Sequence, residues 1–224
     1  MAKILLDIGA HLGETLEIAR NRRWEFDTIW SFEPAPQCWP ALDRLADDRT
    51  RVMRFGLWTE NARLPLYDPG AIGASMFHGK GGASTSVDAE FRDAAAWFHE
   101  HVSASDEVLM KVNCEGAECD LLDHLLASGE LTKVDELVVH FDVRKVPGQE
   151  HRERETRARL DAAGVPYRPA EAIFFGRNTQ EKTANWLRWY HSSRLGRLRY
   201  SVLRRVEFAV RVPLWRLRQR RRAG

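Results

Sequence analysis

Two short segments hold residues whose types and spacing could bind a ribose-containing cofactor. The pattern Asp7-x-Gly9-x-x-x-Gly13 follows an apolar run, and its glycines permit a tight turn from strand to helix that a ligand can approach closely. A helix that starts after this turn offers free N–H groups to a carboxylate or a phosphate. Glu33 ends the next apolar run, where an acid can accept hydrogen bonds from two ribose hydroxyls.

The glycine pattern favours S-adenosylmethionine over a nicotinamide dinucleotide. Three residues separate Gly9 from Gly13, and His11 lies between them, so the dinucleotide pattern GxGxxG is not met. An acid directly after the first strand, Asp7, suits an aminoacyl ammonium better than a pyrophosphate. Since S-adenosylmethionine carries such an ammonium, we predict that it is the cofactor.

A second set of chemically capable residues follows two later apolar runs. Asn113 and Glu115 come after the run at 108–112, and His140 and Asp142 lie at the end of the run at 136–141. Residues 140 and 142 share one face of a strand, so an imidazole and a carboxylate could meet beside Glu115. We expect His140 to act as general base, with Asp142 or Glu115 orienting it. The alternative is a strand-end histidine that serves the fold alone.

The same four side chains could instead hold a metal ion. Amide and carboxylate oxygens are suitable ligands for Mg²⁺ or Mn²⁺, and an imidazole can complete such a set. Asn113, Glu115, His140 and Asp142 are therefore also candidate metal ligands. This alternative is left open beside the acid–base interpretation.

Strands and helices alternate along the chain, which predicts an α/β fold with a mostly parallel sheet and helices on both faces. Strands are expected at residues 3–8, 28–32, 51–55, 64–67, 108–112 and 136–141, with late strands at Tyr167 and 173–175. Helices are expected at 14–22, 38–45, 89–101, 117–126 and 152–163. The glycine- and serine-rich stretch 70–86 is longer than a connector needs to be, so it should cover or form a site. In such sheets ligands bind beyond the carboxyl ends of the strands, where the candidate residues lie.

Three motifs, in this order, resemble the FkbM family of methyltransferases. They are Asp7-Ile8-Gly9-Ala10-His11-Leu12-Gly13, Phe32-Glu33-Pro34 and Lys111-Val112-Asn113-Cys114-Glu115-Gly116-Ala117-Glu118. The resemblance covers roughly residues 3–175. It implies a class I, Rossmann-like methyltransferase fold and mostly O-methylation, with a sugar, a glycolipid or polysaccharide, or a natural product as the acceptor.

The resemblance also implies which positions bind the cofactor. Asp7, Gly9 and Gly13 would line the methionine portion. Ala10, His11 and Asn113 are further cofactor-binding positions. Glu33 and Pro34 would lie at the ribose, and Gly56 and Leu57 beside the adenine.

One departure from the family pattern bears on catalysis. The family usually has an aspartate where this chain has Asn113, and an amide cannot take up a proton. The alternative function is therefore a catalytically weak binding protein of methyltransferase fold that works through its basic tail.

The charge distribution divides the chain into an acidic body and a basic tail. Residues 186–224 contain twelve arginines, no lysine and one acid, Glu207, although the whole chain has a formal net charge of only +2. We predict a methyltransferase domain at 1–185 and an arginine-rich amphipathic helical tail at 186–224. An anionic membrane surface is the favoured partner of the tail, ahead of docking on the acidic body or a second subunit, with nucleic acid third.

The remaining composition predicts a cytoplasmic protein, and the tail predicts binding at the inner face of a membrane. The three cysteines form neither an even set nor a CxxC pair, which indicates a reducing compartment. No signal segment starts the chain, and no apolar run is long enough to span a bilayer.

Overall fold

The structure is a computed structural model that describes residues 1–78, 85–170, 176, 178–193 and 197. It divides into two compact units, Met1–Ala170 and Glu171–Gly224, which are described separately. The first unit contains both sheets and all the predicted site residues.

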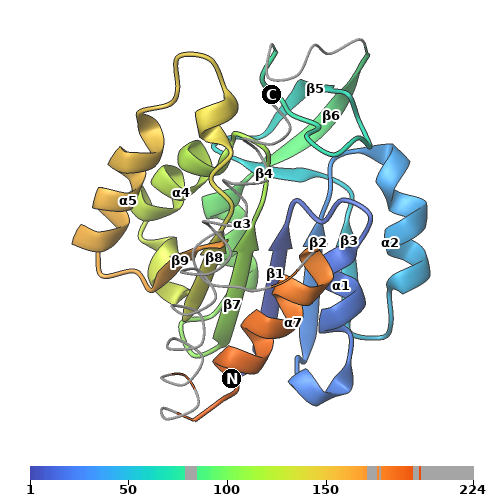
Figure 1. Ribbon diagram of the computed structural model, residues 1–224, viewed down its shortest axis with the longest axis vertical. Coiled ribbons are helices and arrows are strands. Elements are labelled where there is room, and N and C mark those ends of the chain that lie inside the picture. The colour runs from blue at the N-terminus through green and yellow to red at the C-terminus, as the bar shows by residue number, and fades with distance from the viewer. Residues whose placement is uncertain (79–84, 171–175, 177, 194–196, 198–224) are drawn as a thin grey trace, which may run out of the picture. The chain divides into compact units, whose positions relative to one another are not determined.

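The centre of the first unit is a six-stranded sheet whose pairings are all parallel (Figure 1). Its strands are β1 (Lys3–Ile8), β2 (Thr28–Phe32), β3 (Thr50–Met53), β7 (Glu107–Val112), β8 (Glu136–Val139) and β9 (Tyr167–Pro169). Their order is β3-β2-β1-β7-β8-β9, so the direction of winding reverses between β1 and β7. A ligand crevice is expected beyond the carboxyl ends of these two strands.

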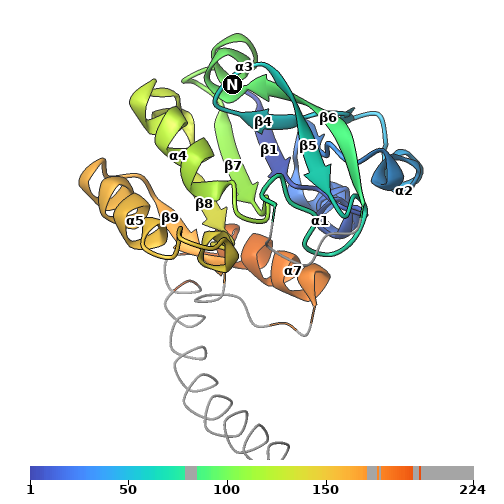
Figure 2. The same ribbon diagram turned by 90° about the horizontal axis from the view of Figure 1, so that it is seen from above.

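Helices cover both faces of this sheet, because its strands bury apolar side chains on either side. Figure 2 shows α1 (Glu14–Ala19) and α2 (Trp39–Leu45) on one face, with α4 (Glu118–Ala127) and α5 (Arg152–Ala162) on the other. Helix α3 (Ala94–His101) packs on the same face as α4. Alternate residues of β1, namely Ile4, Leu6 and Ile8, enter the main core cluster with α3 and α4. The predicted α/β fold is confirmed.

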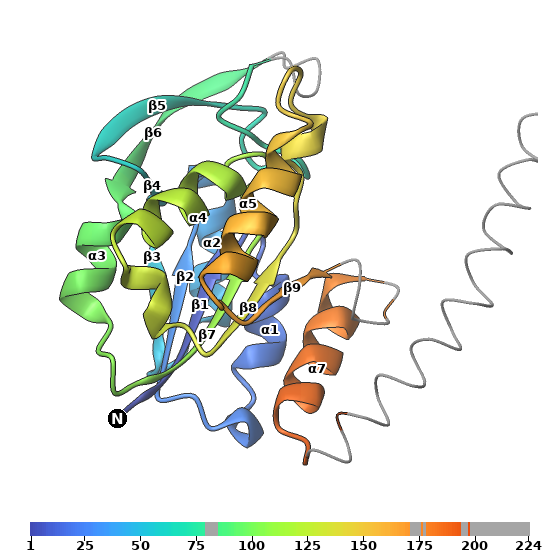
Figure 3. The same cartoon turned by 90° about the vertical axis from the view of Figure 1, so that its left-hand side faces the viewer.

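A second sheet lies at the carboxyl end of the first, as the views in Figures 1 and 3 agree. It consists of β4 (Gly56–Trp58), β5 (Ala62–Tyr67) and β6 (Ser86–Asp93), in the order β4-β6-β5. The helix predicted over 89–101 is therefore wrong for residues 89–93. Ala89 and Phe91 are buried while their neighbours are more exposed, an alternation that suits a strand paired with both β4 and β5.

The described part of the second unit is mainly α7 (Thr179–Tyr190). The side chain of Asn178 caps this helix by accepting a hydrogen bond of 2.9 Å from the N–H of Glu181. The predicted boundary between residues 185 and 186 lies inside α7, and the division of the chain into domains stays a prediction. The late strand at 173–175 and most of the basic tail lie outside the described residues. Within the described part of the chain, no helix is long and apolar enough to cross a membrane.

Candidate functional site

The loop between β1 and α1, residues 9–13, is held against two neighbouring strand ends. The N–H groups of Gly9 and Ala10 both donate to the carbonyl of Phe32, at 3.1 and 3.0 Å. Gly9 has a φ of +79°, and a Cβ added there would lie 2.0 Å from the carbonyl oxygen of Asn113. The first glycine is therefore required by the approach of two backbone segments, which the motif alone does not reveal.

Gly13 meets a different constraint, because it packs between helices. Its φ is +91°, and a Cβ would lie 2.6 Å from a δ-carbon of Leu45 in α2. Its carbonyl accepts the N–H of Glu17 at 2.8 Å, which closes the first turn of α1. The spacing of the two glycines thus fixes the path of the loop from β1 into α1.

Glu33, at the end of β2, ties the loop to its own strand end. Its Oε2 accepts the N–H of His11 at 2.7 Å, and its Oε1 accepts the N–H of Ala35 at 2.9 Å, across Pro34. Burial raises the pKa of this carboxyl, and the two N–H donors oppose the rise. Each carboxylate oxygen has a second lone pair, so Glu33 can still accept hydrogen bonds from the hydroxyl groups of a ligand.

Asp7 is fully buried and is paired inside the protein. The ammonium of Lys111, in β7, lies 2.9 Å from Asp7 Oδ1. Burial raises the pKa of Asp7, and this ammonium opposes the rise. Asp7 supports the loop from within the sheet, and its direct contact with a cofactor stays a prediction.

Asn113, directly after β7, supplies an acceptor at the crevice. Its N–H donates to the carbonyl of Ile8 at 2.9 Å, which joins the ends of β1 and β7. Its side-chain Oδ1 is buried and has no hydrogen-bond partner among the described residues. A buried acceptor in this state suits a donor such as an ammonium group. The next residue, Cys114, has its thiol pKa raised well above the usual value by burial, so it is not a thiolate nucleophile.

Residues 68–77, which we name the cover segment, are fastened to the ends of the central strands. The imidazole Nε2 of His11 lies 3.4 Å from the carbonyl oxygen of Gly70, and the hydroxyl of Ser75 donates to the carbonyl of Glu115 at 2.7 Å. Ser75 also exchanges backbone hydrogen bonds with Tyr67 at the end of β5. The described part of the 70–86 stretch thus contacts two of the predicted site residues, and its role as a cover stays a prediction.

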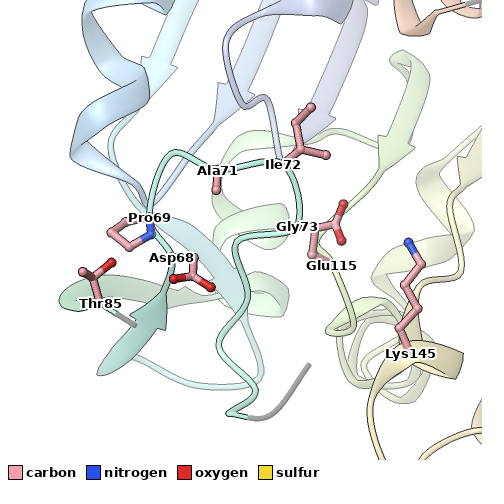
Figure 4. Close-up of a pocket in the computed structure, with 8 residues that line it drawn as sticks. All are labelled: Asp68, Pro69, Ala71, Ile72, Gly73, Thr85, Glu115 and Lys145. Carbon is pink, nitrogen blue, oxygen red and sulfur yellow. The ribbon is translucent and has the colours of Figure 1, made fainter. Parts of the chain in front are cut away.

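A cavity of about 450 Å³ opens beside the cover segment (Figure 4). Its lining residues are Asp68, Pro69, Ala71, Ile72, Gly73, Thr85, Glu115 and Lys145. Figure 4 shows Asp68 and Thr85 on one side, and Glu115 and Lys145 on the other. Glu115 is the one predicted catalytic residue in this lining, and its backbone φ of +53° is unusual for a residue with a side chain. The cavity therefore offers carboxylate, hydroxyl and ammonium groups to a polar ligand.

The other two predicted catalytic residues follow β8. Asp142 is buried, and its carboxylate pairs at 2.8 Å with Lys145, which lines the cavity. Asp142 itself is not part of the lining. The backbone N–H of His140 donates to the carbonyl of Val112 at 2.9 Å, and His140 is not part of the lining. The role of His140 as base stays a prediction.

The two positions predicted beside the adenine lie in β4. Leu57 is 3% exposed and belongs to the main core cluster, and a Cβ on Gly56 would lie 2.5 Å from the ring of Phe91. Both are thus used in packing, and their proximity to a cofactor stays a prediction.

The metal alternative receives no support from the geometry. Within the described residues, no three or more His, Cys, Asp and Glu side chains form a group that could hold a metal ion.

Three residues of this site were given no role in it from the sequence, although Lys111 begins one of the quoted motifs. Lys145 lines the cavity, Ser75 anchors the cover segment, and Lys111 pairs with Asp7 and also donates to the carbonyl of Gly9. Lys111 could have been found, because a lysine in an apolar strand must have a partner when buried. Ser75 and Lys145 carry no comparable local signal.

The sheet order, the glycine loop after β1 and the acid at the end of β2 together define a Rossmann-like, doubly wound α/β fold. No family model matches the chain, and no curated protein matches it. Among solved structures, the chain is similar to the methyltransferase FkbM from Methylobacillus flagellatus KT, with 16% identity and a TM-score of 0.46. The match covers 74% of this chain and 38% of that one, so the chain spans well under half of its neighbour.

Proposed function

We propose that this protein is an S-adenosylmethionine-dependent methyltransferase that acts on a hydroxyl group. The observation that carries the proposal is the set of acceptors around the crevice between β1 and β7. Glu33 has lone pairs available for ribose hydroxyls, and Asn113 has a buried Oδ1 that suits an ammonium donor. S-adenosylmethionine has both groups, whereas a nicotinamide dinucleotide has no aminoacyl ammonium.

The residues at the crevice fit this cofactor. Glu33 would hold the ribose and Asn113 the aminoacyl group, while the loop at Gly9 and Gly13 would follow the methionine portion. Bound S-adenosylmethionine supplies a methyl group on a positively charged sulfur, which a nucleophile displaces in line. The protein must therefore mainly align donor and acceptor.

The cavity beside the cover segment is the proposed site of the acceptor. Glu115 lines it and belongs to the segment directly after Asn113, so a hydroxyl in the cavity would lie beside the proposed cofactor position. Glu115 can accept the proton of that hydroxyl, and Lys145 can orient a polar substituent. The polar lining supports a sugar, a glycolipid or a hydroxylated natural product.

The decisive experiment is titration calorimetry of the full chain with S-adenosylmethionine. We expect S-adenosylmethionine to bind to the wild type. Its affinity should be at least tenfold lower in Glu33→Ala, because the ribose hydroxyls lose the carboxylate that accepts their hydrogen bonds. Glu60→Ala is the matched control, since Glu60 is an exposed acid on the loop between β4 and β5. Absence of binding to the wild type at millimolar concentrations would overturn the proposal.

Turnover separates an enzyme from a binding protein of the same fold. A cell extract supplied with S-adenosylmethionine should yield an acceptor whose mass rises by one methyl group in place of hydrogen. If the cofactor binds and no acceptor gains mass, the catalytically weak alternative is the better description.

We further propose that the arginine-rich tail binds an anionic membrane surface, which would bring a lipid-linked acceptor to the site. The twelve arginines of residues 186–224 support this proposal. The full chain should sediment with phosphatidylserine vesicles and be released by salt, whereas Arg204, Arg205 and Arg211 changed together to glutamine should weaken sedimentation, because three of the twelve arginines of the tail are lost. Sedimentation of this triple variant equal to that of the wild type would refute this role.

A further inference from the structure

Three polar side chains form a row across the centre of the sheet, beneath the glycine loop. Ser31 in β2, Asp7 in β1 and Lys111 in β7 are neighbours in strand register. Their exposed fractions are 0%, 0% and 6%. Central parallel strands are normally apolar throughout, so an ion pair at this place calls for an explanation.

Stability alone does not explain the pair. Removing an ammonium and a carboxylate from water costs several kcal/mol for each, and apolar residues of similar size often stabilise a protein as well or better. The pair must therefore be judged by what else it holds.

Lys111 holds the backbone of the loop as well as Asp7. Its Nζ donates to the carbonyl of Gly9 at 2.7 Å and lies 2.9 Å from Asp7 Oδ1. On the other side of the same residue, the N–H of Gly9 donates to the carbonyl of Phe32 at 3.1 Å. Both polar groups of the Gly9 backbone are thus fixed, one toward β2 and one toward β7.

The orientation of the Gly9 carbonyl determines the path of the following loop residues. The next residue, Ala10, also donates to Phe32, and the N–H of His11 donates to Glu33 at 2.7 Å. A rotation of the peptide after Gly9 would move these donors. It would also remove the hydrogen bond that the N–H of His11 donates to Glu33, the residue that we assign to the ribose.

We propose that Lys111 is a positioning residue, whose ammonium fixes the Gly9 carbonyl and so keeps the loop in the conformation that binds S-adenosylmethionine. Asp7 serves as the counter-charge that allows the ammonium to be buried. The inference rests on the proposed function for its ligand, and its structural half concerns the loop alone.

The test uses the full chain with two variants, Lys111→Met and the double variant Asp7→Asn with Lys111→Met. The single variant leaves Asp7 buried without its cation and should unfold in much less urea, or not fold at all. The double variant leaves no buried charge, so its unfolding midpoint should return most of the way to that of the wild type. Ser31→Ala is the control, since it changes the third residue of the row without touching the loop.

Two measurements on the double variant decide the inference. Hydrogen exchange of the amides at residues 9–13 should speed up at least tenfold, and the Kd for S-adenosylmethionine should rise at least tenfold, while Ser31→Ala changes neither. Wild-type exchange and wild-type affinity in a stable double variant would overturn it. If the wild type does not bind S-adenosylmethionine, the proposed function fails, and the exchange measurement still decides whether Lys111 positions the loop.

Discussion

The substitution Gly9→Ala tests the close approach of the glycine loop to the end of β7. The added methyl group would lie 2.0 Å from the carbonyl oxygen of Asn113, far inside van der Waals contact. That oxygen belongs to backbone that is itself held by the hydrogen bond from the Asn113 N–H to Ile8, so it cannot move aside easily. The loop must therefore shift away from β7.

Gly9→Ala is destabilised both by its backbone conformation and by the close contact with Asn113. A variant at a second glycine measures the backbone contribution alone. Gly129 has the same φ of +79° but nothing within 4 Å of an added Cβ, so Gly129→Ala meets only the backbone penalty. This penalty is about 1–2 kcal/mol. Gly9→Ala meets it as well, together with about 1–3 kcal/mol for an overpacked contact.

Urea unfolding and thermal melting of the two variants provide the assay. At roughly 2–4 °C per kcal/mol for a chain of this size, Gly9→Ala should melt several degrees below Gly129→Ala. It should also lose affinity for S-adenosylmethionine, whereas Gly129→Ala keeps it. Equal melting temperatures for the two variants would show that the contact with Asn113 does not constrain the loop.

Three further predictions concern Glu33, the acid that we propose for the ribose, and the cover segment. Since burial raises the pKa of Glu33, affinity for S-adenosylmethionine should fall as pH drops through this raised value, and Glu33→Gln should bind weakly with little dependence on pH. His11 contacts two acceptors, Glu14 and the Gly70 carbonyl, so both ring nitrogens must donate, and its pKa is raised, chiefly by the bond to Glu14. The cover segment should therefore be protected from hydrogen exchange at low pH and lose protection as pH rises through the pKa of His11. The variant His11→Asn should remove this pH dependence, and the control His78→Asn should retain it. A pH profile of exchange in His11→Asn that equals the wild-type profile would contradict the reasoning. Ser75→Ala should lower stability by about 1 kcal/mol and increase proteolysis within 68–77, in contrast to the exposed Ser86→Ala; equal proteolysis of the two would show that the Ser75 hydroxyl does not anchor the segment.

The central strands could be predicted from sequence because each is a buried apolar run between turn signals. The predicted runs at 3–8 and 28–32 coincide with β1 and β2. The error at 89–93 has a clear cause. Phe91, Ala95 and Phe98 have helical spacing, but Phe91 lies in β6, whose partners β4 and β5 are far from it in sequence. Local periodicity does not contain that information.

The sequence could predict that the candidate site residues lie at strand ends, but it could not predict which of their side chains contact one another. Glu33 and Asn113 follow apolar runs, so their position at the carboxyl edge follows from the fold. The pairing of Asp7 with Lys111 joins residues more than one hundred positions apart, and only the register of β1 with β7 brings them together. The hydrogen bond from the Ser75 hydroxyl to the carbonyl of Glu115, in the segment after β7, likewise joins residues that are distant in sequence.

The cover segment lies in one continuous stretch, residues 62–93, which includes β5 and β6 and contacts the proposed cofactor crevice through His11 and Glu115. It connects β5 to β6, whose backbone pairing from Ala62 to Phe91 lies wholly in the small sheet. A contiguous transplant of residues 62–93 from a homologous protein would thus replace one wall of the cavity and leave β1, β2 and β7 untouched. Exchange of this single segment should change the preference for the proposed acceptor, because it supplies six of the eight lining residues while Glu115 and Lys145 are kept.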